Sequence, residues 1–266
     1  MNMRLAISTD LDISRVENLP IFLKGVFDTC SLIPQLSQVV VVITGYSSDL
    51  ARLDFGEYKD KVVTASIPDG SEWGNVYPTG YKTALANNAD IVLEMDMGGT
   101  HNPSEIKLVL APIISALEEN KNARTASFSS RNLPGSENYY KTSRQLTSKI
   151  GTQLAKWFLL GNQGKSLSDL TSGFEAFSRA AVEYLFQRFP PEHMITPSYG
   201  PFYLWQTEIR VLAILAGIEY KEVAITYGKG VKSYGLSLKT YLRAGWGFAL
   251  LLSNKIRGKY SIPSAI

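Results

Sequence analysis

Residues 90–106 read DIVLEMDMGGTHNPSEI, and this stretch decides the fold. A short apolar run ends in two carboxylates, Glu94 and Asp96, and a Gly-rich turn then leads through Pro103 into an apolar segment. Proline suits the first turn of a helix, where its missing N–H would have no partner. We therefore expect a buried strand, a loop and a helix, with Asp96 either facing a ligand or capping the turn.

Strand-like and helix-like segments alternate through the first half of the chain. The strand-like runs are RLAIS (4–8), QVVVVIT (38–44), KVVTASI (61–67), DIVLEMD (90–96) and ARTASFSS (123–130), and the helical runs are VENLPIFLKGVFDTC (16–30), TGYKTALANN (79–88) and PSEIKLVLAPIISALEEN (103–120). Such alternation predicts an α/β fold with a mainly parallel sheet flanked by helices. Ligands bind such sheets beyond the carboxyl ends of the strands, so we expect the site there.

The second half of the chain has a different pattern. It predicts a long helix over 139–160, a strand or turn over 170–178, a buried helix over 201–218, a strand over 220–227 and a final helix over 237–255. The chain shows no internal repeat and no low-complexity linker. We therefore expect one domain over residues 1–230 and a C-terminal helical extension over 231–266.

Composition excludes several classes of protein. Of the 266 residues, 45% are hydrophobic and 19% are charged, which argues against disorder and coiled coil. A net charge of +3 is too weak to favour nucleic-acid binding, although a local patch for phosphates is compatible with it. With one cysteine, Cys30, and two histidines, the chain has neither an internal disulfide nor a Cys-rich zinc site.

Two features bear on location. The first residues, MNMRLAISTDLD, do not have the long apolar run of a signal peptide, so we expect a cytoplasmic protein. The segment AGWGFALLL (244–252) is flanked by basic residues and is too short to span a bilayer. It predicts either an amphipathic helix in a membrane interface or a helix packed on the core.

Several blocks of the sequence resemble a known family in content and order. These blocks are GNVYPTGYKTALANNADIVLEMD (74–96), GGTHNPSEI (98–106), SSRNLPGS (129–136), DLTSGFEAFSRAAVEYL (169–185) and EIRVLAILAGIEYKEVAITYGKGVKSYGLSLKTYLRA (208–244). They are similar to the dolichol-phosphate mannosyltransferase-like branch of the family-two glycosyltransferases. The resemblance implies a GT-A, nucleotide-sugar-binding fold. It also implies an inverting transfer of a sugar to a polyprenyl-type lipid phosphate at the cytoplasmic membrane face.

The resemblance assigns Asp96 to the donor site. It matches the first residue of an Asp-x-Asp motif, whose carboxylates hold a divalent cation, Mg²⁺ or Mn²⁺, on the nucleotide diphosphate. Gly98 stands at the second carboxylate position. Glu94 either compensates for that loss or is a buried carboxylate without a ligand role. The available polar contacts for the nucleotide are Asp10, Ser47 and Asp49, and the alternative for the last two is to cap the next helix.

Other site residues follow from the same resemblance. Arg131 and Arg144 match arginines that face the acceptor phosphate and the donor diphosphate, and guanidinium groups suit that task. Substrate contacts are further expected from Gly74 and Gly80, which bracket a loop entering a helix, from Asp169, Ser172 and Gly173 at the sugar end of the pocket, and from Lys232, which faces a phosphate. We expect His101 to order its loop by hydrogen bonding rather than to bind metal.

Two alternatives to this function stay open. The enzyme alternative is transfer to a soluble or surface-polysaccharide acceptor. The alternative from another class is a catalytically weakened GT-A module that binds a nucleotide without turnover, motivated by Gly98 and by Thr44 and Gly45, which stand where the family has an acidic pair.

Overall fold

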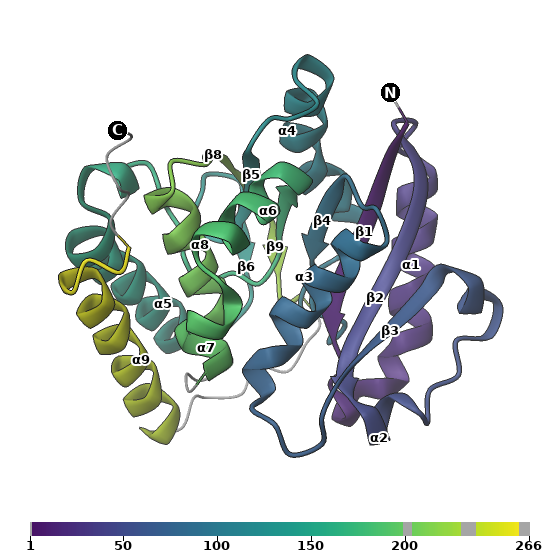
Figure 1. The fold of residues 1–266 in the computed structure, drawn as a ribbon, viewed down its shortest axis with the longest axis horizontal. Helices are drawn as coiled ribbons and strands as arrows, with labels where there is room; N and C mark the ends of the chain where they lie inside the picture. The colour runs from purple at the N-terminus through teal and green to yellow at the C-terminus, as the bar shows by residue number, and fades with distance from the viewer. Residues whose placement is uncertain (1, 199–203, 230–237, 261–266) are drawn as a thin grey trace.

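A seven-stranded sheet organises the protein (Figure 1). The computed structural model describes residues 2–198, 204–229 and 238–260. Within them the strand order is β3–β2–β1–β4–β7–β5–β8. The strands are β1 Met3–Asp10, β2 Leu36–Tyr46, β3 Val62–Ile67, β4 Ile91–Glu94, β5 Thr125–Ser130, β7 Glu175–Ser178 and β8 Glu219–Ala224, while β6 Glu137–Asn138 and β9 Thr226–Tyr227 form a separate parallel pair.

The expectation of a mainly parallel sheet is confirmed. Every pair in the large sheet is parallel except those of β7, which runs antiparallel to both β4 and β5. The segment predicted as a strand or turn is thus a strand, inserted in the middle of the sheet. The carboxyl ends of the parallel strands lie at one edge, where loops from both halves of the chain meet.

Helices cover both faces of the sheet. The helical elements are η1 Ile13–Asn18, α1 Leu19–Ser31, α2 Ser47–Leu50, η2 Gly56–Lys61, η3 Trp73–Asn75, α3 Val76–Ala86, η4 Pro103–Glu105, α4 Ile106–Glu119, α5 Thr142–Ala155, η5 Lys156–Leu160, η6 Gly161–Gly164, α6 Arg179–Arg188, η7 Pro191–His193, α7 Ile195–Ser198, α8 Trp205–Leu215 and α9 Leu238–Ile256. α1 and α4 pack on one face with Leu5 and Ile7 of β1. α3, α6 and α8 pack on the other face with Ala6. This alternation along β1 follows from the two-residue period of a strand.

Local sequence signals explain how several helices begin. The side chain of Asn102 accepts a hydrogen bond from the backbone N–H of Ser104, directly before Pro103. Ser178 accepts one in the same way from Ala181 at the start of α6. Such caps satisfy N–H groups that have no partner inside the helix.

The long helix predicted over 139–160 begins later than expected. α5 starts at Thr142, and its last turn, η5, is π-helical. The final helix forms as predicted, and its Leu251 is fully buried in the core. Lys255 donates to the carbonyl of Phe158 in η5 at 3.0 Å, so α9 is attached to the end of α5. None of the helices in the described ranges combines the length and apolarity that a bilayer span needs.

The two glycines expected to bracket a loop have another arrangement. Gly74 lies in η3 and Gly80 inside α3, because that helix begins at Val76 rather than at residue 79. A Cβ atom on Gly80 would lie 2.2 Å from Oγ of Ser8 and 3.0 Å from Oγ1 of Thr44. Glycine at this position therefore lets α3 pack directly on β1 and β2.

We predict that Gly80→Ala lowers the free energy of unfolding by about 2 kcal/mol, because the added methyl group overpacks the helix–sheet contact. Gly151→Ala in α5 is the matched control. Its Cβ would meet no atom within 4 Å, so the better helix propensity of alanine should raise stability by roughly 0.5–1 kcal/mol. Urea unfolding measures both values.

Removing the Ser8 hydroxyl in Ser8→Ala/Gly80→Ala should recover part of the loss, since Oγ is the nearest atom to the new methyl group. A Gly80→Ala protein as stable as the wild type would contradict this account of the contact.

Candidate active site

Asp10 and Asp96 lie at the carboxyl edge of the sheet. Asp10 ends β1, and Asp96 follows β4 by two residues. In the parallel register Ser8 is opposite Glu94, which brings Asp10 and Asp96 to the same level of the edge. The Asp96 side chain is 39% exposed, so an approaching ligand can reach it.

The electrostatic environment of these two acids is unfavourable for a pair of negative charges. Burial, then the neighbouring Asp10 carboxylate, raises the pKa of Asp96 to about 8, while the Arg15 guanidinium opposes that shift. Burial also raises the pKa of Asp10, against a hydrogen bond from the side chain of Trp73. A nearby positive charge therefore stabilises this edge in its ionised form.

The second position of the Asp-x-Asp motif does not supply a metal ligand. The carbonyl of Gly98 accepts a hydrogen bond from Nη1 of Arg15 at 3.2 Å. A Cβ on Gly98 would lie only 2.5 Å from that nitrogen. In the described part of the chain, no three His, Cys, Asp or Glu side chains are grouped so that they could hold a metal ion. With one carboxylate left in the motif and the Arg15 guanidinium beside it, the residues present disfavour the divalent cation expected at Asp96.

Glu94 has a structural role, which agrees with the interpretation of this residue as a buried carboxylate without a ligand role. It is buried, and its carboxylate accepts hydrogen bonds from Nε1 of Trp205 at 2.7 Å and Nε2 of Gln206 at 2.8 Å. Burial raises its pKa well above the ordinary value. The ring of Tyr77 from α3 stacks on Trp205 at a centroid distance of 5.5 Å. Glu94 thus joins β4 to α8 beneath the carboxyl edge of the sheet.

His101 does not order its loop by hydrogen bonding. Both ring nitrogens are buried without a hydrogen-bond partner, and Nε2 lies 4.0 Å from Oδ2 of Asp96. The ring packs against Phe174 and Tyr227 at centroid distances of 5.1 and 5.0 Å. Burial, assisted by the charge of Arg131, lowers the pKa of His101 to about 3, so the ring is neutral and serves as packing.

Tyr227 of β9 connects the acidic edge with the arginines. Its ring packs on His101, which touches Asp96, and on Tyr140 at a centroid distance of 4.7 Å. The guanidinium of Arg131 lies over the Tyr227 ring at 4.9 Å, and that of Arg144 over the Tyr140 ring at 4.2 Å. Asp96, Arg131 and Arg144 are therefore brought into one region through two tyrosines.

The two arginines have different surroundings. Arg131 is buried and pairs with Asp169, with Nε to Oδ2 at 2.7 Å and Nη2 to Oδ1 at 2.8 Å. The Arg131 guanidinium holds the pKa of Asp169 well below its usual range, against the opposing effect of burial. Arg144 is half-buried on α5, and no carboxylate of the described residues forms a salt bridge with it.

The residues expected at the sugar end of the donor pocket are buried beneath the protein surface. Asp169 and Ser172 are fully buried, and the Ser172 hydroxyl lies 2.6 Å from that of Ser129 in β5. A Cβ on Gly173 would touch Gln206 at ordinary contact distances. These residues support the wall of the site, and Lys232 lies outside the described residues.

Three functional residues were not identified from the sequence. Arg15, Tyr140 and Tyr227 carry no motif of their own, although Tyr227 lies within a block that resembles the family. Their contacts join segments far apart in the chain: Arg15 and Gly98, for example, are separated by 83 positions. The only sequence signal was the unusual glycine at position 98, which shows that a side chain is missing without showing what replaces it.

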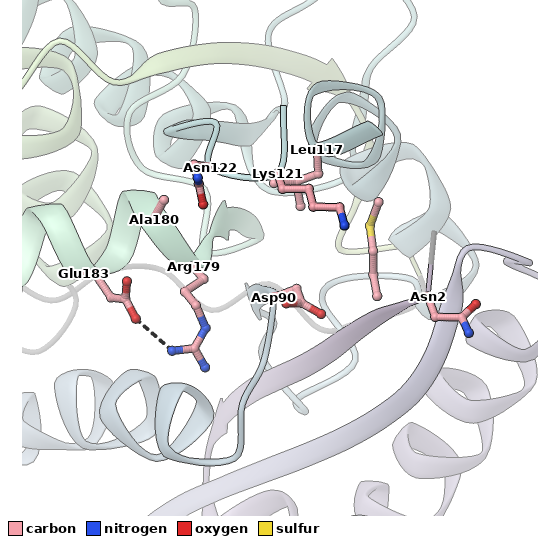
Figure 2. A pocket seen from close by; sticks show the side chains of 9 residues that line it. Asn2, Asp90, Leu117, Lys121, Asn122, Arg179, Ala180 and Glu183 are labelled. Carbon is pink, nitrogen blue, oxygen red and sulfur yellow. Dashed lines mark hydrogen bonds and ion pairs between the residues drawn. The ribbon is translucent and has the colours of Figure 1, made fainter. Parts of the chain in front are cut away.

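A hollow of about 320 Å³ lies at the opposite edge of the sheet (Figure 2). It is lined in part by Asn2 and Asp90, which precede β1 and β4. Its main charged groups already have protein partners, since Asp90 accepts from the N–H of Arg4 and Arg179 pairs with Glu183. This hollow is therefore not part of the candidate active site.

We predict that Asp169→Asn lowers the free energy of unfolding at pH 7 by about 3–5 kcal/mol, because it leaves the Arg131 charge buried without its counter-ion. The pKa of Asp169 is depressed in the folded protein, so its contribution is complete above the unfolded pKa of about 4 and is lost as pH falls below it. The difference from wild type should shrink by about 1 kcal/mol at pH 3. Urea unfolding at both pH values tests this.

The control is Glu183→Gln, which breaks the exposed pair with Arg179 and should cost under about 0.5 kcal/mol. A loss at Asp169→Asn no larger than that of the control would disprove the structural role of the buried pair.

The sequence of the chain is similar to those of known glycosyltransferases. No family model matches the chain. It is 25% identical over 219 residues to polyprenol monophosphomannose synthase of Mycolicibacterium smegmatis, with 79% of this chain and 72% of the relative aligned. It is 26% identical to UDP-N-acetylglucosamine--dolichyl-phosphate N-acetylglucosaminyltransferase of Methanococcus voltae, and that match spans 64% of each chain, less than two thirds of the relative.

Solved structures show the same fold. The glucosyl-3-phosphoglycerate synthase of Mycobacterium tuberculosis, in complex with Mn²⁺, UDP and its product, matches 99% of this chain and 82% of its own with a TM-score of 0.55. At 15% identity this likeness concerns the fold alone. The chain therefore shares the GT-A fold of these structures, and its sequence is similar to family-two glycosyltransferases of the dolichol-phosphate mannosyltransferase-like branch.

Proposed function

We propose that the protein transfers a sugar from a nucleotide sugar to the phosphate of a polyprenyl lipid, with inversion, at the cytoplasmic face of a membrane. This proposal rests on the arrangement around Tyr227. The exposed carboxylate of Asp96 lies on one side of this ring, next to His101, and the half-buried guanidinium of Arg144 lies on the other, over Tyr140. A carboxylate suits the sugar or ribose hydroxyls of a donor. A guanidinium suits the oxygens of a phosphate.

This arrangement fits a phosphate nucleophile. An oxygen of the lipid phosphate attacks the anomeric carbon of the sugar, and the bond from that carbon to the nucleoside diphosphate breaks. Because the acceptor phosphate is already an anion, the reaction requires no strong general base. The rate then depends on orientation of the two substrates and on stabilisation of the charge that builds on the leaving diphosphate.

Arg131 and Arg144 have separate roles in this proposal. The Arg131 guanidinium is held by Asp169, so it supports the wall of the site and contributes a fixed positive charge. Arg144, which stacks on Tyr140 without a carboxylate partner in the described residues, is the group available to a phosphate. Lys232 is proposed as a further phosphate contact.

The membrane part of the proposal rests first on charge distribution. Residues 138–168 contain five Lys and Arg and no Asp or Glu, and residues 223–266 contain seven and none. The remainder of the chain therefore carries 15 basic against 24 acidic residues, although the whole chain has a net charge of only +3. Basic segments that lack acids are attracted to anionic lipid surfaces.

Exposed apolar side chains lie on the same segments. Leu146, Ile150 and Trp157 on α5 and η5 are 56%, 51% and 67% exposed, and Leu242 and Trp246 on α9 are 67% and 63% exposed. α9, in yellow, lies beside α5 in Figure 1. We name α5, η5 and α9 together the basic face. Tryptophan and basic side chains in this combination suit the headgroup region of a bilayer.

We predict that Arg144→Ala slows transfer to a short polyprenyl phosphate by roughly tenfold to a hundredfold, the effect of losing one charge-assisted contact in the transition state. Donor affinity should change much less, because this contact strengthens as charge develops on the leaving group. Steady-state kinetics and donor titration provide the two values.

Lys107→Ala on α4 is the matched control, since it removes the same charge from an exposed position on another helix. Equal losses of donor affinity and turnover in Arg144→Ala would contradict this role, because they would show a contact already complete in the ground state. Donor binding by the wild type without measurable transfer would favour the nucleotide-binding module without turnover.

We predict further that Trp157→Ser/Trp246→Ser reduces binding to vesicles containing anionic lipid by at least tenfold, because two interfacial aromatic anchors are removed. High salt should release the wild-type protein as the attraction of its basic face is screened. Vesicle co-sedimentation measures both effects.

Ile21→Ser on α1 is the control, because Ile21 is 74% exposed and lies outside the basic face. Failure of the wild-type protein to bind anionic vesicles at low salt would favour a soluble acceptor instead.

A further inference from the structure

Arg15 lies directly beyond the carboxyl end of β1, next to the site expected to hold a metal ion. It belongs to η1, where its backbone departs from helical geometry with φ −131° and ψ 21°. Its Nε lies 3.4 Å from Oδ2 of Asp12, and its Nη1 donates to the Gly98 carbonyl at 3.2 Å. This places a guanidinium across the second position of the Asp-x-Asp motif.

In its observed position, Arg15 leaves no room for a side chain at residue 98. A Cβ on Gly98 would lie 2.5 Å from Nη1, 3.3 Å from Cδ and 3.5 Å from Cζ of Arg15. The arginine therefore packs against the backbone of Gly98 and occupies the space that the Cβ atom of an aspartate would need. An aspartate here and the observed position of Arg15 are mutually exclusive.

The guanidinium remains accessible to a ligand. The Arg15 side chain is 34% exposed, and Asp12 and the Gly98 carbonyl are its side-chain polar partners among the described residues. A guanidinium carries five N–H donors, so these two contacts leave several of them available. Asp96, within electrostatic range of Arg15, remains open beside it.

We infer that Arg15 replaces the divalent cation of the donor site and binds the diphosphate of the nucleotide sugar directly. A guanidinium presents fixed, paired donors that match phosphate oxygens, and it is charged at every physiological pH. It supplies one positive charge where a divalent ion would supply two. The inference rests on the proposed function, because it needs a nucleoside diphosphate at this edge of the sheet.

The test is isothermal titration calorimetry of the full-length protein with UDP, GDP, CDP and ADP, in EDTA and again in MnCl₂. For the nucleotide that binds, we expect wild-type affinities in the two conditions to agree within about twofold. Arg15→Ala should lower the affinity by about tenfold or more, the loss typical of one charge-assisted contact, and Arg15→Lys by less. Arg52→Ala, which removes an exposed arginine paired with Asp49, should bind as the wild type does.

A second variant tests the exclusion between Gly98 and Arg15. In Arg15→Ala/Gly98→Asp a carboxylate replaces the guanidinium, so we expect nucleotide binding to depend on Mn²⁺. Circular dichroism and melting temperature confirm that each variant is folded.

Two results would overturn the inference alone. They are nucleotide binding by the wild type that needs Mn²⁺, and a folded Arg15→Ala protein that binds in EDTA as the wild type does. Absence of binding to all four nucleotides in both conditions would overturn the proposed function together with the inference.

Discussion

The buried guanidinium of Arg210 is the interaction on which the rest of the site depends. Arg210 lies on α8 with no exposed surface, and it pairs with Glu175 of β7. Its Nη1 also donates to the carbonyl oxygens of Ser129 in β5 and of Asp169, at 3.2 and 2.8 Å. Because a buried charge is costly unless its hydrogen bonds are made, these partners must be in place together. One side chain thus fixes α8, two strands and the loop before β7.

That constraint also fixes the segment around Asp169, which forms a wall of the candidate site. The backbone of Asp169 is held by Arg210, and its carboxylate is held by Arg131. Glu222 of β8 accepts hydrogen bonds from the N–H groups of Ser168 and Asp169 as well. A wall fixed from three sides preorganises the charges near it, so Arg144 on α5 can respond to a substrate without the core moving.

The sequence predicts the strands and helices well because their signals are local. β-branched runs give β1, β2 and β4, and Pro103 marks the start of η4 and α4. The antiparallel direction of β7 could not be predicted from these local signals, because the orientation of a four-residue strand depends on the strands it pairs with.

The residues of the candidate site could likewise be predicted only where the signal is local in sequence. Asp96 and Arg131 could be found because each follows a strand within a block of sequence that resembles the family. Arg131 and Asp169 are 38 positions apart, and neither segment contains a local signal that the two side chains form an ion pair. The structural use of Gly80 was missed because a glycine pattern alone does not distinguish a loop from close helix packing.

The most direct measurement of the account is a product-resolved transfer assay with a panel of nucleotide sugars. It would compare a short polyprenyl phosphate with the matching polyprenol, which lacks the phosphate, and identify the product by mass spectrometry and its anomeric configuration by NMR. We expect a glycosylated lipid only from the phosphate acceptor, with the configuration inverted relative to the donor. Equal transfer to the alcohol, or donor hydrolysis without transfer, would contradict it.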